Sequence, residues 1–174
     1  CGTTVLRQAR EDAILVIGSQ VRQDGRSASL TAPNGQAQQA LLVVALADAD
    51  VAAETLTLSE AHGTGTSLGD PIEMRSIQTA LLALRSYTPL AVGGVKANIG
   101  HAEPAAGMTG LLKLALGLHE REAVSNAKLR LMNPHVGGAL RGMACALSLQ
   151  LGMIKFGSRV GGVSSFGYSG TIAH

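Results

Sequence analysis

The sequence predicts a layered α/β fold in one folded unit, and two observations lead to this prediction. Segments with the pattern of strands alternate along the chain with segments that have helical periodicity, which is typical of layered α/β domains. The composition agrees, because 46% of the 174 residues are hydrophobic and 22 are glycines. A chain of this length can bury a substantial core. That core must be aliphatic, because aromatic residues make up only 2%.

The amino-terminal part of the chain holds two apolar segments separated by polar residues. Residues 5–6 and 13–21 are apolar, as in strands, and the polar residues 7–12 predict a turn between them. The Asp-Gly pair at 24–25 and the Pro-Asn-Gly run at 33–35 predict two further turns. We expect the two apolar segments to form a hairpin or to be neighbouring strands.

Helix and strand patterns then follow one another. The sequence predicts helices over residues 36–46 and 105–122 and strands over 55–60 and 90–95, with a loop at 62–69. In the second helix, five side chains are expected to be largely buried: Leu111, Leu112, Leu114, Ala115 and Leu118.

A further helix is predicted to begin at Asp70. Asp70 can cap the helix, Pro71 suits its first turn, and Glu73 can reach back as in a capping box. An apolar face continues this helix to about Leu84. Nearer the carboxyl end, the Asn-Pro pair at 133–134 predicts a loop.

The last part of the chain is predicted to contain short strands and a glycine-rich loop. Strands are expected in parts of residues 143–151 and 162–165, and the loop is expected at residues 167–170.

Composition argues against several classes of function. The net charge is +2, and Lys and Arg are scattered singly, so nucleic acid is not an expected partner. The longest apolar stretches, such as residues 40–47, are too short to span a membrane. Cys1 and Cys145 have neither a disulfide-type nor a metal-type spacing, which favours a cytoplasmic or other reducing compartment. The chain opens on Cys1 without a methionine, so we expect a native amino terminus to be missing.

Three polar clusters lie at expected strand ends or loops, where functional sites usually occur. They span residues 60–66, 96–101 and 164–171. A nucleotide-binding loop is one alternative for the glycines near His62, but neither G-x-G-x-x-G nor G-x-x-x-x-G-K-[ST] is present. A metal site formed by His62, His101 and Cys145 is another alternative, without support from spacing. We predict no metal.

Taken together and in order, the clusters resemble a known enzyme family. Residues 60–73 read EAHGTGTSLGDPIE, residues 95–107 read VKANIGHAEPAAG, and residues 163–174 read VSSFGYSGTIAH. They closely resemble the later motifs of β-ketoacyl synthases, particularly those of modular polyketide synthases. Residues 21–35, VRQDGRSASLTAPNG, resemble the stretch that precedes those motifs. The resemblance covers nearly the whole chain.

The resemblance implies a thiolase-like layered α/β/α fold, of which residues 1–174 form one partial domain, mostly its carboxy-terminal half. It implies an acyltransferase that joins an acyl thioester to a malonyl-type thioester by decarboxylative Claisen condensation. By resemblance, His62 and His101 are the active-site histidines, Lys96 is the active-site lysine, and Glu73 is the carboxylate that pairs with it. Two neutral imidazole N–H donors can stabilise the enolate that decarboxylation leaves. The alternative for Glu73 is capping alone, and that for Lys96 is a solvated charge.

The resemblance also assigns binding residues. Thr64 and Thr66 match threonines that bind the phosphopantetheine arm of an acyl carrier protein, although they could instead satisfy loop backbone groups. The last cluster matches a mobile gating loop, in which the backbone N–H of Tyr168 completes an oxyanion hole and its side chain borders the acyl pocket. The residues of this loop are Phe166, Gly167, Tyr168, Ser169 and Gly170.

The chain also departs from the family pattern. The nucleophilic cysteine lies upstream in the family, and Cys145 is interpreted as a small structural residue, so no nucleophile is expected in this chain. Ile172 stands where the family usually has Asn, which removes a local hydrogen bond. Tyr168 is bulkier and more polar than many residues at the gate.

Three functions remain open from the sequence. The first is a polyketide ketosynthase, incomplete and inactive as this segment alone, whose partners are an acyl carrier protein and acyl and malonyl-type thioesters. The second is a catalytically silent ketosynthase-like dimer partner or chain-length scaffold. The third is a fatty-acid ketosynthase. The chain itself is expected to bind no cofactor, since phosphopantetheine is carried by the carrier protein. A homodimer is expected for the complete protein.

Overall fold

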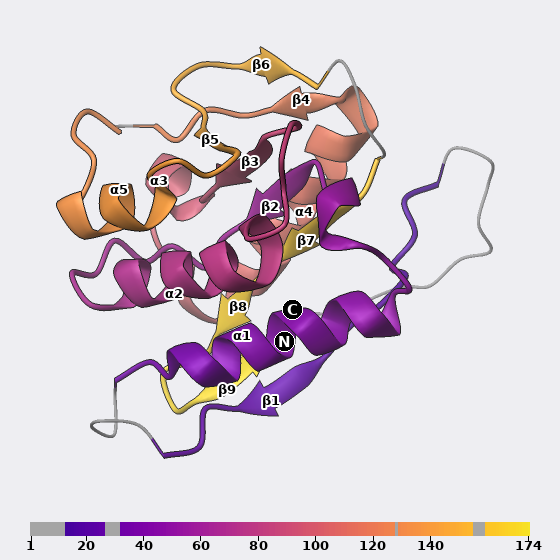
Figure 1. Ribbon diagram of the computed structural model, residues 1–174. Coiled ribbons are helices and arrows are strands. Elements are labelled where there is room, and N and C mark those ends of the chain that lie inside the picture. The colour runs from indigo at the N-terminus through magenta and orange to yellow at the C-terminus, as the bar shows by residue number, and fades with distance from the viewer. Residues whose placement is uncertain (1–12, 27–31, 128, 155–158) are drawn as a thin grey trace.

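The computed structural model describes residues 13–26, 32–127, 129–154 and 159–174 (Figure 1). The strand and turn predicted for residues 5–12, and Cys1, lie outside this part of the chain. The helices are α1 (Gly35–Asp48), α2 (Gly69–Ile77), α3 (Lys96–Ile99), α4 (Ala106–Glu120) and α5 (Pro134–Leu140). A π-helical segment, η2 (Gln78–Leu82), continues α2, and η1 (Ala53–Thr55) and η3 (Glu103–Ala105) are short 3₁₀ helices. The strands are β1 (Val21–Gln23), β2 (Leu58–Glu60), β3 (Leu90–Gly93), β4 (Glu122–Ala123), β5 (Cys145–Leu147), β6 (Gly152–Met153), β7 (Gly161–Val163), β8 (Ser165–Phe166) and β9 (Thr171–Ala173).

A four-stranded parallel sheet forms the centre of the fold, in the order β5-β3-β2-β7. Glu60 at the end of β2 is in register with Gly93 of β3 and Val163 of β7. Because the strands are parallel, their carboxyl ends meet at one edge, and the loops that follow them meet there as well. The register therefore places the three polar clusters of the sequence at a common edge.

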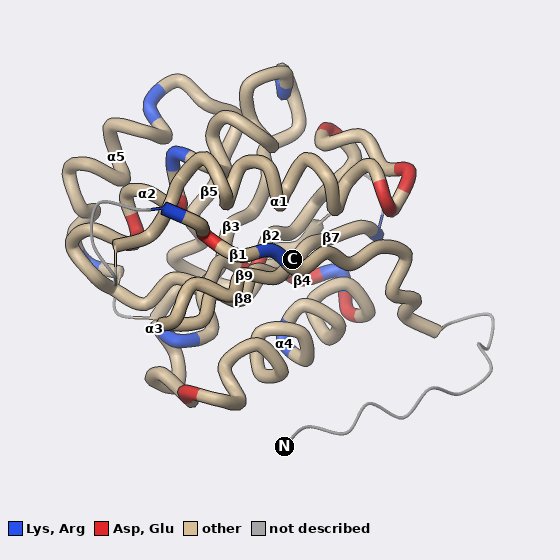
Figure 2. Tube along the Cα trace, turned by 90° about the horizontal axis from the view of Figure 1, so that it is seen from below, with Lys and Arg blue, Asp and Glu red and all other residues tan. Residues whose placement is uncertain are grey.

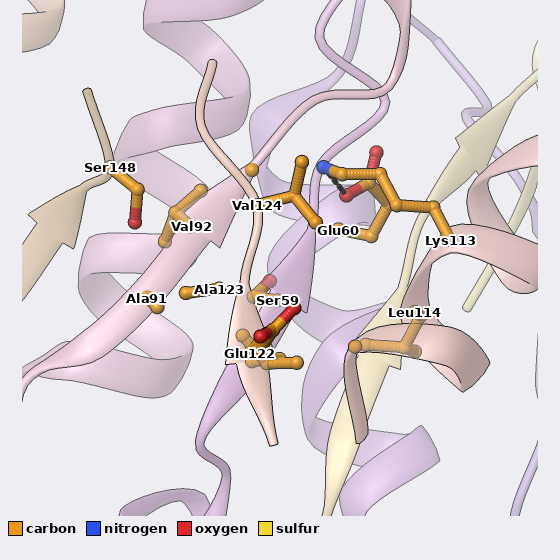
Figure 3. A pocket seen from close by; sticks show the side chains of 13 residues that line it. Ser59, Glu60, Ala91, Val92, Lys113, Leu114, Glu122, Ala123, Val124 and Ser148 are labelled. Carbon is orange, nitrogen blue, oxygen red and sulfur yellow. Dashed lines mark hydrogen bonds and ion pairs between the residues drawn. The ribbon is translucent and has the colours of Figure 1, made fainter. Parts of the chain in front are cut away.

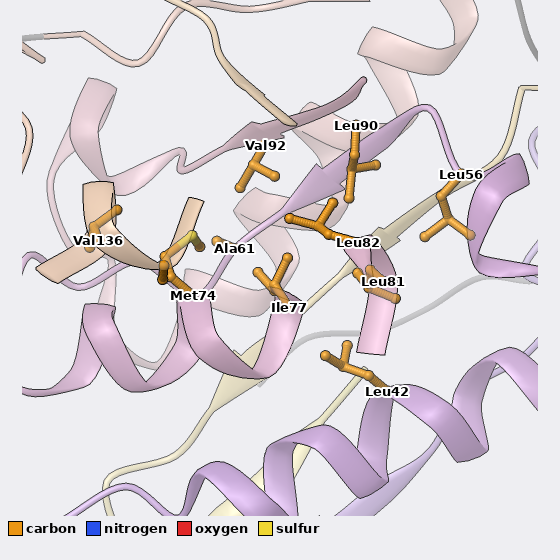
Figure 4. Close-up of a cluster of buried hydrophobic side chains, with 11 residues drawn as sticks. Leu42, Leu56, Ala61, Met74, Ile77, Leu81, Leu82, Leu90, Val92 and Val136 are labelled. Carbon is orange, nitrogen blue, oxygen red and sulfur yellow. The ribbon is translucent and has the colours of Figure 1, made fainter. Parts of the chain in front are cut away.

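Helices cover both faces of this sheet, as in a layered α/β domain. On one face, Leu90 and Val92 pack against Ile77 of α2 and Leu81 of η2, and Leu42 of α1 closes the cluster (Figure 4). On the other face, Leu58 packs against α4. Each fully buried Leu or Ile contributes roughly 1.5–3 kcal/mol, so these aliphatic clusters hold the sheet edge in place.

A second, antiparallel sheet lies beneath α1 and joins both ends of the described chain (Figure 1). Its order is β1-β9-β8, with Val21 opposite Ala173 and Phe166 opposite Ile172. Ile172, which stands at the family's Asn position, is 1% exposed. This strand is therefore anchored by apolar packing, and the turn between β8 and β9 carries the predicted gating loop.

Helix α1 confirms the helix predicted over residues 36–46. Its cap is Asn34, whose side-chain oxygen accepts hydrogen bonds from the N–H groups of Gln36 at 3.0 Å and Ala37 at 3.2 Å. The predicted helix over 105–122 is confirmed as α4, but Leu112 is 57% exposed and not buried as predicted.

Helix α2 begins within one residue of the predicted position, but the residues predicted to cap it have other partners. The helix begins at Gly69, and the hydroxyl of Thr66 accepts the Gly69 N–H at 3.1 Å. Asp70 instead accepts the N–H of Gly65 at 3.1 Å, and Glu73 turns away from the helix start toward His62. No capping box forms because both carboxylates serve the preceding loop.

Other boundaries also differ from the prediction. Of the strand predicted over residues 13–21, only Val21 lies in a strand, β1, and most of the large side chains before it are exposed. The strand predicted over 55–60 is shortened to β2, since the residues before it form the short 3₁₀ helix η1. The loop predicted at 133–134 begins the helix α5, with the Asn133 side chain accepting the His135 N–H at 2.9 Å. The strands predicted within 143–151 and 162–165 are confirmed.

Candidate active site

Three loops leave the same edge of the parallel sheet and carry the candidate site. The loop after β2 carries His62, the turn after β3 carries Lys96 and His101, and the segment after β7 carries Phe166. The imidazoles of His62 and His101 lie edge to face, with ring centroids 6.0 Å apart and an interplanar angle of 84°. The phenyl ring of Phe166 lies 5.3 Å from the His62 ring. Residues separated by more than a hundred positions thus meet at one point.

His62 is held as a neutral imidazole. Burial, then the nearby Lys96 cation and His101, lower the pKa of His62 from 6.5 to about 4. Its Nδ1 accepts the backbone N–H of Phe166 at 3.3 Å and lies 3.5 Å from the Lys96 Nζ. Because Nδ1 is the acceptor, the ring proton of the neutral form is on Nε2.

His101 has the same tautomer for a different reason. The backbone N–H of Glu103 donates to His101 Nδ1 at 2.8 Å, so in the neutral ring Nε2 carries the proton. Glu103 also has a positive φ of 46°, which is uncommon for a residue other than glycine. The two histidines therefore each have an Nε2–H available as a hydrogen-bond donor.

Lys96 is the first residue of the short helix α3 and lies beside His62. Its Nζ donates to the His62 carbonyl oxygen as well as approaching Nδ1. Burial lowers the pKa of Lys96, while Glu73, Glu60 and Asp70 act in the opposite direction. The ammonium thus lies close enough to the imidazole to disfavour its protonation.

Glu73 binds the histidine loop by hydrogen bonds and acts on Lys96 only through its charge. Its side chain is buried, and its two oxygens accept the N–H groups of His62 at 2.7 Å and Gly63 at 2.9 Å. Among the described residues, no ion pair joins Glu73 to Lys96, which differs from the pairing that the resemblance implied. Burial raises the pKa of Glu73 to about 7 despite these two hydrogen bonds.

Thr64 and Thr66 lie on the exposed part of the same loop. Their hydroxyl oxygens are 3.3 Å apart, and the Thr66 hydroxyl also accepts the Gly69 N–H. Gly63 and Gly65 have positive φ values of 46° and 77°, a conformation that glycine adopts without strain. Both threonines line the adjacent cavity.

The predicted gating loop closes on itself. The Gly167 N–H donates to the Thr171 carbonyl at 2.7 Å, and the Gly170 N–H donates to the Gly167 carbonyl at 3.0 Å. The Tyr168 N–H donates to no described group, and the Tyr168 side chain is 85% exposed. The loop is therefore an ordered turn in which the Tyr168 N–H stays available.

Two cavities adjoin at His101. The larger, of about 730 Å³, is lined by His62, both threonines and residues 166–170. The smaller, of about 510 Å³, is lined by Lys96, Asp70 and Asn126. Thr64, Glu73 and His101 line both. The site can therefore take an extended substrate past the two imidazoles.

Three further features considered from the sequence are the Cys145 thiol, a metal site and a membrane-spanning helix. Burial raises the pKa of the Cys145 thiol to about 11, which disfavours the reactive thiolate. Among the described residues, no group of His, Cys, Asp and Glu side chains is arranged to hold a metal ion. None of the helices described is long and apolar enough to cross a membrane.

The sequence analysis missed one buried charged residue beside the site. Glu60 is 4% exposed and forms an ion pair with Lys113 of α4. One signal was available in the sequence, because Lys113 is the single charged residue within the apolar run 104–118. Pairing with a carboxylate on a neighbouring strand is a common reason for such a placement.

Comparisons with known proteins agree with this architecture. The family model of the β-ketoacyl synthase C-terminal domain matches residues 14–130. An oxazolomycin ketosynthase domain from Streptomyces albus has a TM-score of 0.85 at 36% identity, covering 91% of this chain and 28% of that structure. A ketosynthase from the bacillaene synthase of Bacillus subtilis has a TM-score of 0.82 at 32% identity, covering 91% and 29%. The chain belongs to the β-ketoacyl synthase family, and its fold is the thiolase-like fold of these ketosynthases.

Curated relatives are polyketide synthases. A phenolphthiocerol/phthiocerol polyketide synthase from Mycobacterium tuberculosis is 40% identical over 169 residues, covering 97% of this chain and 8% of that protein. An erythronolide synthase from Saccharopolyspora erythraea is also 40% identical over 169 residues, covering 97% and 5%. The chain thus spans less than a tenth of either polyketide synthase.

Proposed function

We propose that this chain supplies the decarboxylating part of a ketosynthase active site in polyketide biosynthesis. The observation that carries the proposal is the pair of imidazoles, His62 and His101, whose Nδ1 atoms each accept a backbone N–H and whose ring centroids lie 6.0 Å apart beside a cavity of about 730 Å³. In the neutral rings, the two Nε2–H groups are donors suited to an oxyanion that forms on a substrate in that cavity.

The proposed reaction begins with a malonyl-type thioester on an acyl carrier protein. The bond between its α-carbon and carboxylate breaks, carbon dioxide leaves, and the electron pair forms an enolate whose oxygen accepts hydrogen bonds from the two Nε2–H groups. The enolate carbon then attacks the carbonyl of an acyl group carried as a thioester on a cysteine of the enzyme. A carbon–carbon bond forms, the carbon–sulfur bond breaks, and the cysteine leaves as a thiolate. In this proposal the cysteine belongs to a part of the protein outside these 174 residues, which form one partial domain.

The remaining site residues have supporting roles in the proposal. Burial, with Lys96 as the second cause, keeps His62 unprotonated, and Glu73 fixes the His62 loop by its two backbone hydrogen bonds. Thr64 and Thr66 bind the phosphopantetheine arm of the carrier protein. Residues 166–170 gate the acyl site, with the Tyr168 N–H as an oxyanion donor. The complete protein is proposed to be a homodimer.

The silent-partner alternative is less well supported by the site. His62, Lys96 and His101 are all present and lie together, and a scaffold without activity does not require two imidazoles held at one cavity. The relatives described above are polyketide synthases, which favours polyketide over fatty-acid synthesis.

The test measures carbon dioxide release from malonyl-carrier protein by the complete polypeptide and its His101→Ala variant. We expect the variant to lose about 10²- to 10³-fold in rate, as removal of one oxyanion donor does elsewhere. His119→Ala, at an exposed position of α4, is the matched control and should retain the rate. An unchanged rate in His101→Ala would remove His101 from the proposed site.

A further inference from the structure

A buried ion pair lies beneath the candidate active site, away from its cavities. The Lys113 Nζ of α4 lies 2.6 Å from Glu60 Oε2 at the end of β2, and the two side chains are 14% and 4% exposed. Figure 3 shows Lys113 reaching from the helix to the Glu60 carboxylate. The cavity beside the pair is only about 20 Å³, which leaves no room for a substrate. The pair therefore acts through other residues.

The two Glu60 oxygens have different partners. Oε2 binds Lys113, while Oε1 accepts the backbone N–H of Val95. Val95 is the residue immediately before α3, the helical turn that begins with Lys96 and leads to His101. Glu60 itself lies two residues before His62. One carboxylate therefore links the strand that carries His62, the turn that carries Lys96 and the helix that follows His101.

The backbone of Glu60 makes a further link, in addition to the two made by its side chain. Its carbonyl accepts the Ser164 N–H at 2.9 Å, and Ser164 precedes the segment whose Phe166 N–H binds His62. This link does not involve the carboxylate. Changes to the Glu60 side chain thus test the links to Val95 and Lys113 while leaving the acceptor for Ser164 in place.

Close packing fixes the position of the pair. A Cβ on Gly93 would lie 2.6 Å from the Lys113 Nζ and 3.2 Å from Glu60 Oε2, so glycine at this position makes space for the ion pair. Figure 2 shows acidic and basic residues spread over the described chain. The Glu60–Lys113 pair differs from the other ion pair found there, His119–Glu120, because both of its side chains are largely buried. A buried pair need not add stability over apolar side chains, so its geometry requires another explanation.

We propose that Glu60, held by Lys113, is a positioning residue for decarboxylation, because it fixes the turn that presents Lys96 and His101 to His62. This inference rests on the proposed function. The decisive group is the oxygen that accepts the Val95 N–H. Without it, α3 loses this side-chain anchor to β2, and a shift of about 1 Å in a catalytic group can cost about 10²-fold in rate.

Two double variants of the complete polypeptide separate positioning from stability. Glu60→Leu with Lys113→Met removes both charges and the acceptor for Val95. Glu60→Gln with Lys113→Met also removes both charges but keeps an amide oxygen that can accept the Val95 N–H. Removing both partners avoids leaving one buried charge unpaired, which is the main cause of unfolding in single variants.

Three measurements are made on each protein: carbon dioxide release from malonyl-carrier protein, melting temperature, and hydrogen exchange of the Val95 amide. We expect the Leu/Met variant to release carbon dioxide about 10- to 100-fold more slowly than wild type. The Gln/Met variant should recover most of that loss. The Val95 amide should exchange at least about tenfold faster in the Leu/Met variant than in the Gln/Met variant, because it has lost its hydrogen bond.

The outcomes are distinguishable. Equal rates and equal Val95 exchange in the two double variants would overturn the inference, as would a rate loss that only follows a fall in melting temperature. If the wild-type protein releases no carbon dioxide, the proposed function fails, and hydrogen exchange still decides whether Glu60 anchors the turn. Slow release by Leu/Met with recovery by Gln/Met at similar melting temperatures supports the inference.

Discussion

At the scale of single residues, the charge state of His62 depends on one neighbouring cation and on burial. The pKa of His62 is about 4 in the folded protein, against 6.5 for an ordinary imidazole. Because the folded value is the lower one, His62 contributes its full stabilisation above pH 6.5 and loses it as the pH falls toward 4. The same low pKa keeps the Nε2–H donor neutral near neutral pH.

Replacing Lys96 with Met should raise the pKa of His62. The Lys96 ammonium disfavours a second positive charge beside it, so its loss makes protonation of His62 easier. The pKa should remain below 6.5, because burial is the larger cause of the shift. Titration of the His62 ring by NMR in wild type and Lys96→Met measures this, with the exposed ring of His119 as an internal reference. An unchanged His62 midpoint would show that Lys96 does not set the charge state.

At the scale of secondary-structure elements, the local patterns predicted the long elements and missed those set by tertiary contacts. α1 and α4 were predicted because their apolar residues and boundary signals lie within or next to the elements themselves. The four-residue α3 was missed, since its anchor is Glu60 in another strand. The strand predicted over residues 13–21 is real only at its end, where Gln20 exchanges two backbone hydrogen bonds with His174 and Val21 begins β1. Composition alone therefore placed the strand too early in the chain.

For the candidate site, the sequence predicted which residues belong together but not how they contact one another. The grouping of His62, Lys96 and His101 in one active site follows from motif resemblance. Their contacts could not be predicted, because the contacts depend on the register of β2 with β3. Glu73 was assigned to Lys96 or to a helix cap, whereas its oxygens bind the backbone of His62 and Gly63. A side chain's direction from a helix depends on the packing around it, which a single sequence does not contain.

The cap of α1 offers a test at the element scale. The Asn34 oxygen caps the helix, while its Nδ2 donates to the carbonyls of Asp24 at 2.7 Å and Arg26 at 3.1 Å. Asn34→Ala should lower the free energy of unfolding by about 0.5–2 kcal/mol, because the cap is lost. Asn34→Ser keeps a hydroxyl oxygen that can cap the helix and loses the Nδ2 donor without adding a charge, so it should cost less. Chemical denaturation of the complete protein measures both, and equal costs would contradict the assignment of the oxygen as the cap.

At the scale of the whole molecule, α4 is apolar on both sides. Leu114 and Leu118 are buried against the sheet, while Met108, Leu112 and Leu116 are 37%, 57% and 64% exposed. These three residues are spaced four apart and therefore form one stripe along the helix. The chain spans only 28% of the solved oxazolomycin ketosynthase domain. We therefore expect another part of the complete protein to cover this stripe.

Lysines introduced into the exposed apolar stripe of α4 should make the 174-residue segment more soluble but should destabilise the complete protein. Leu112→Lys with Leu116→Lys removes exposed apolar surface from the 174-residue segment, so the segment should become more soluble. In the complete protein the same lysines would be buried, and the free energy of unfolding should fall by at least about 2 kcal/mol per site. Glu120→Lys, an exposed position of the same helix, is the control and should be nearly neutral. Sedimentation of the segment and denaturation of the complete protein measure the two effects. Unchanged stability of the complete protein would show that the stripe faces solvent there, because a lysine on an exposed helix face costs little.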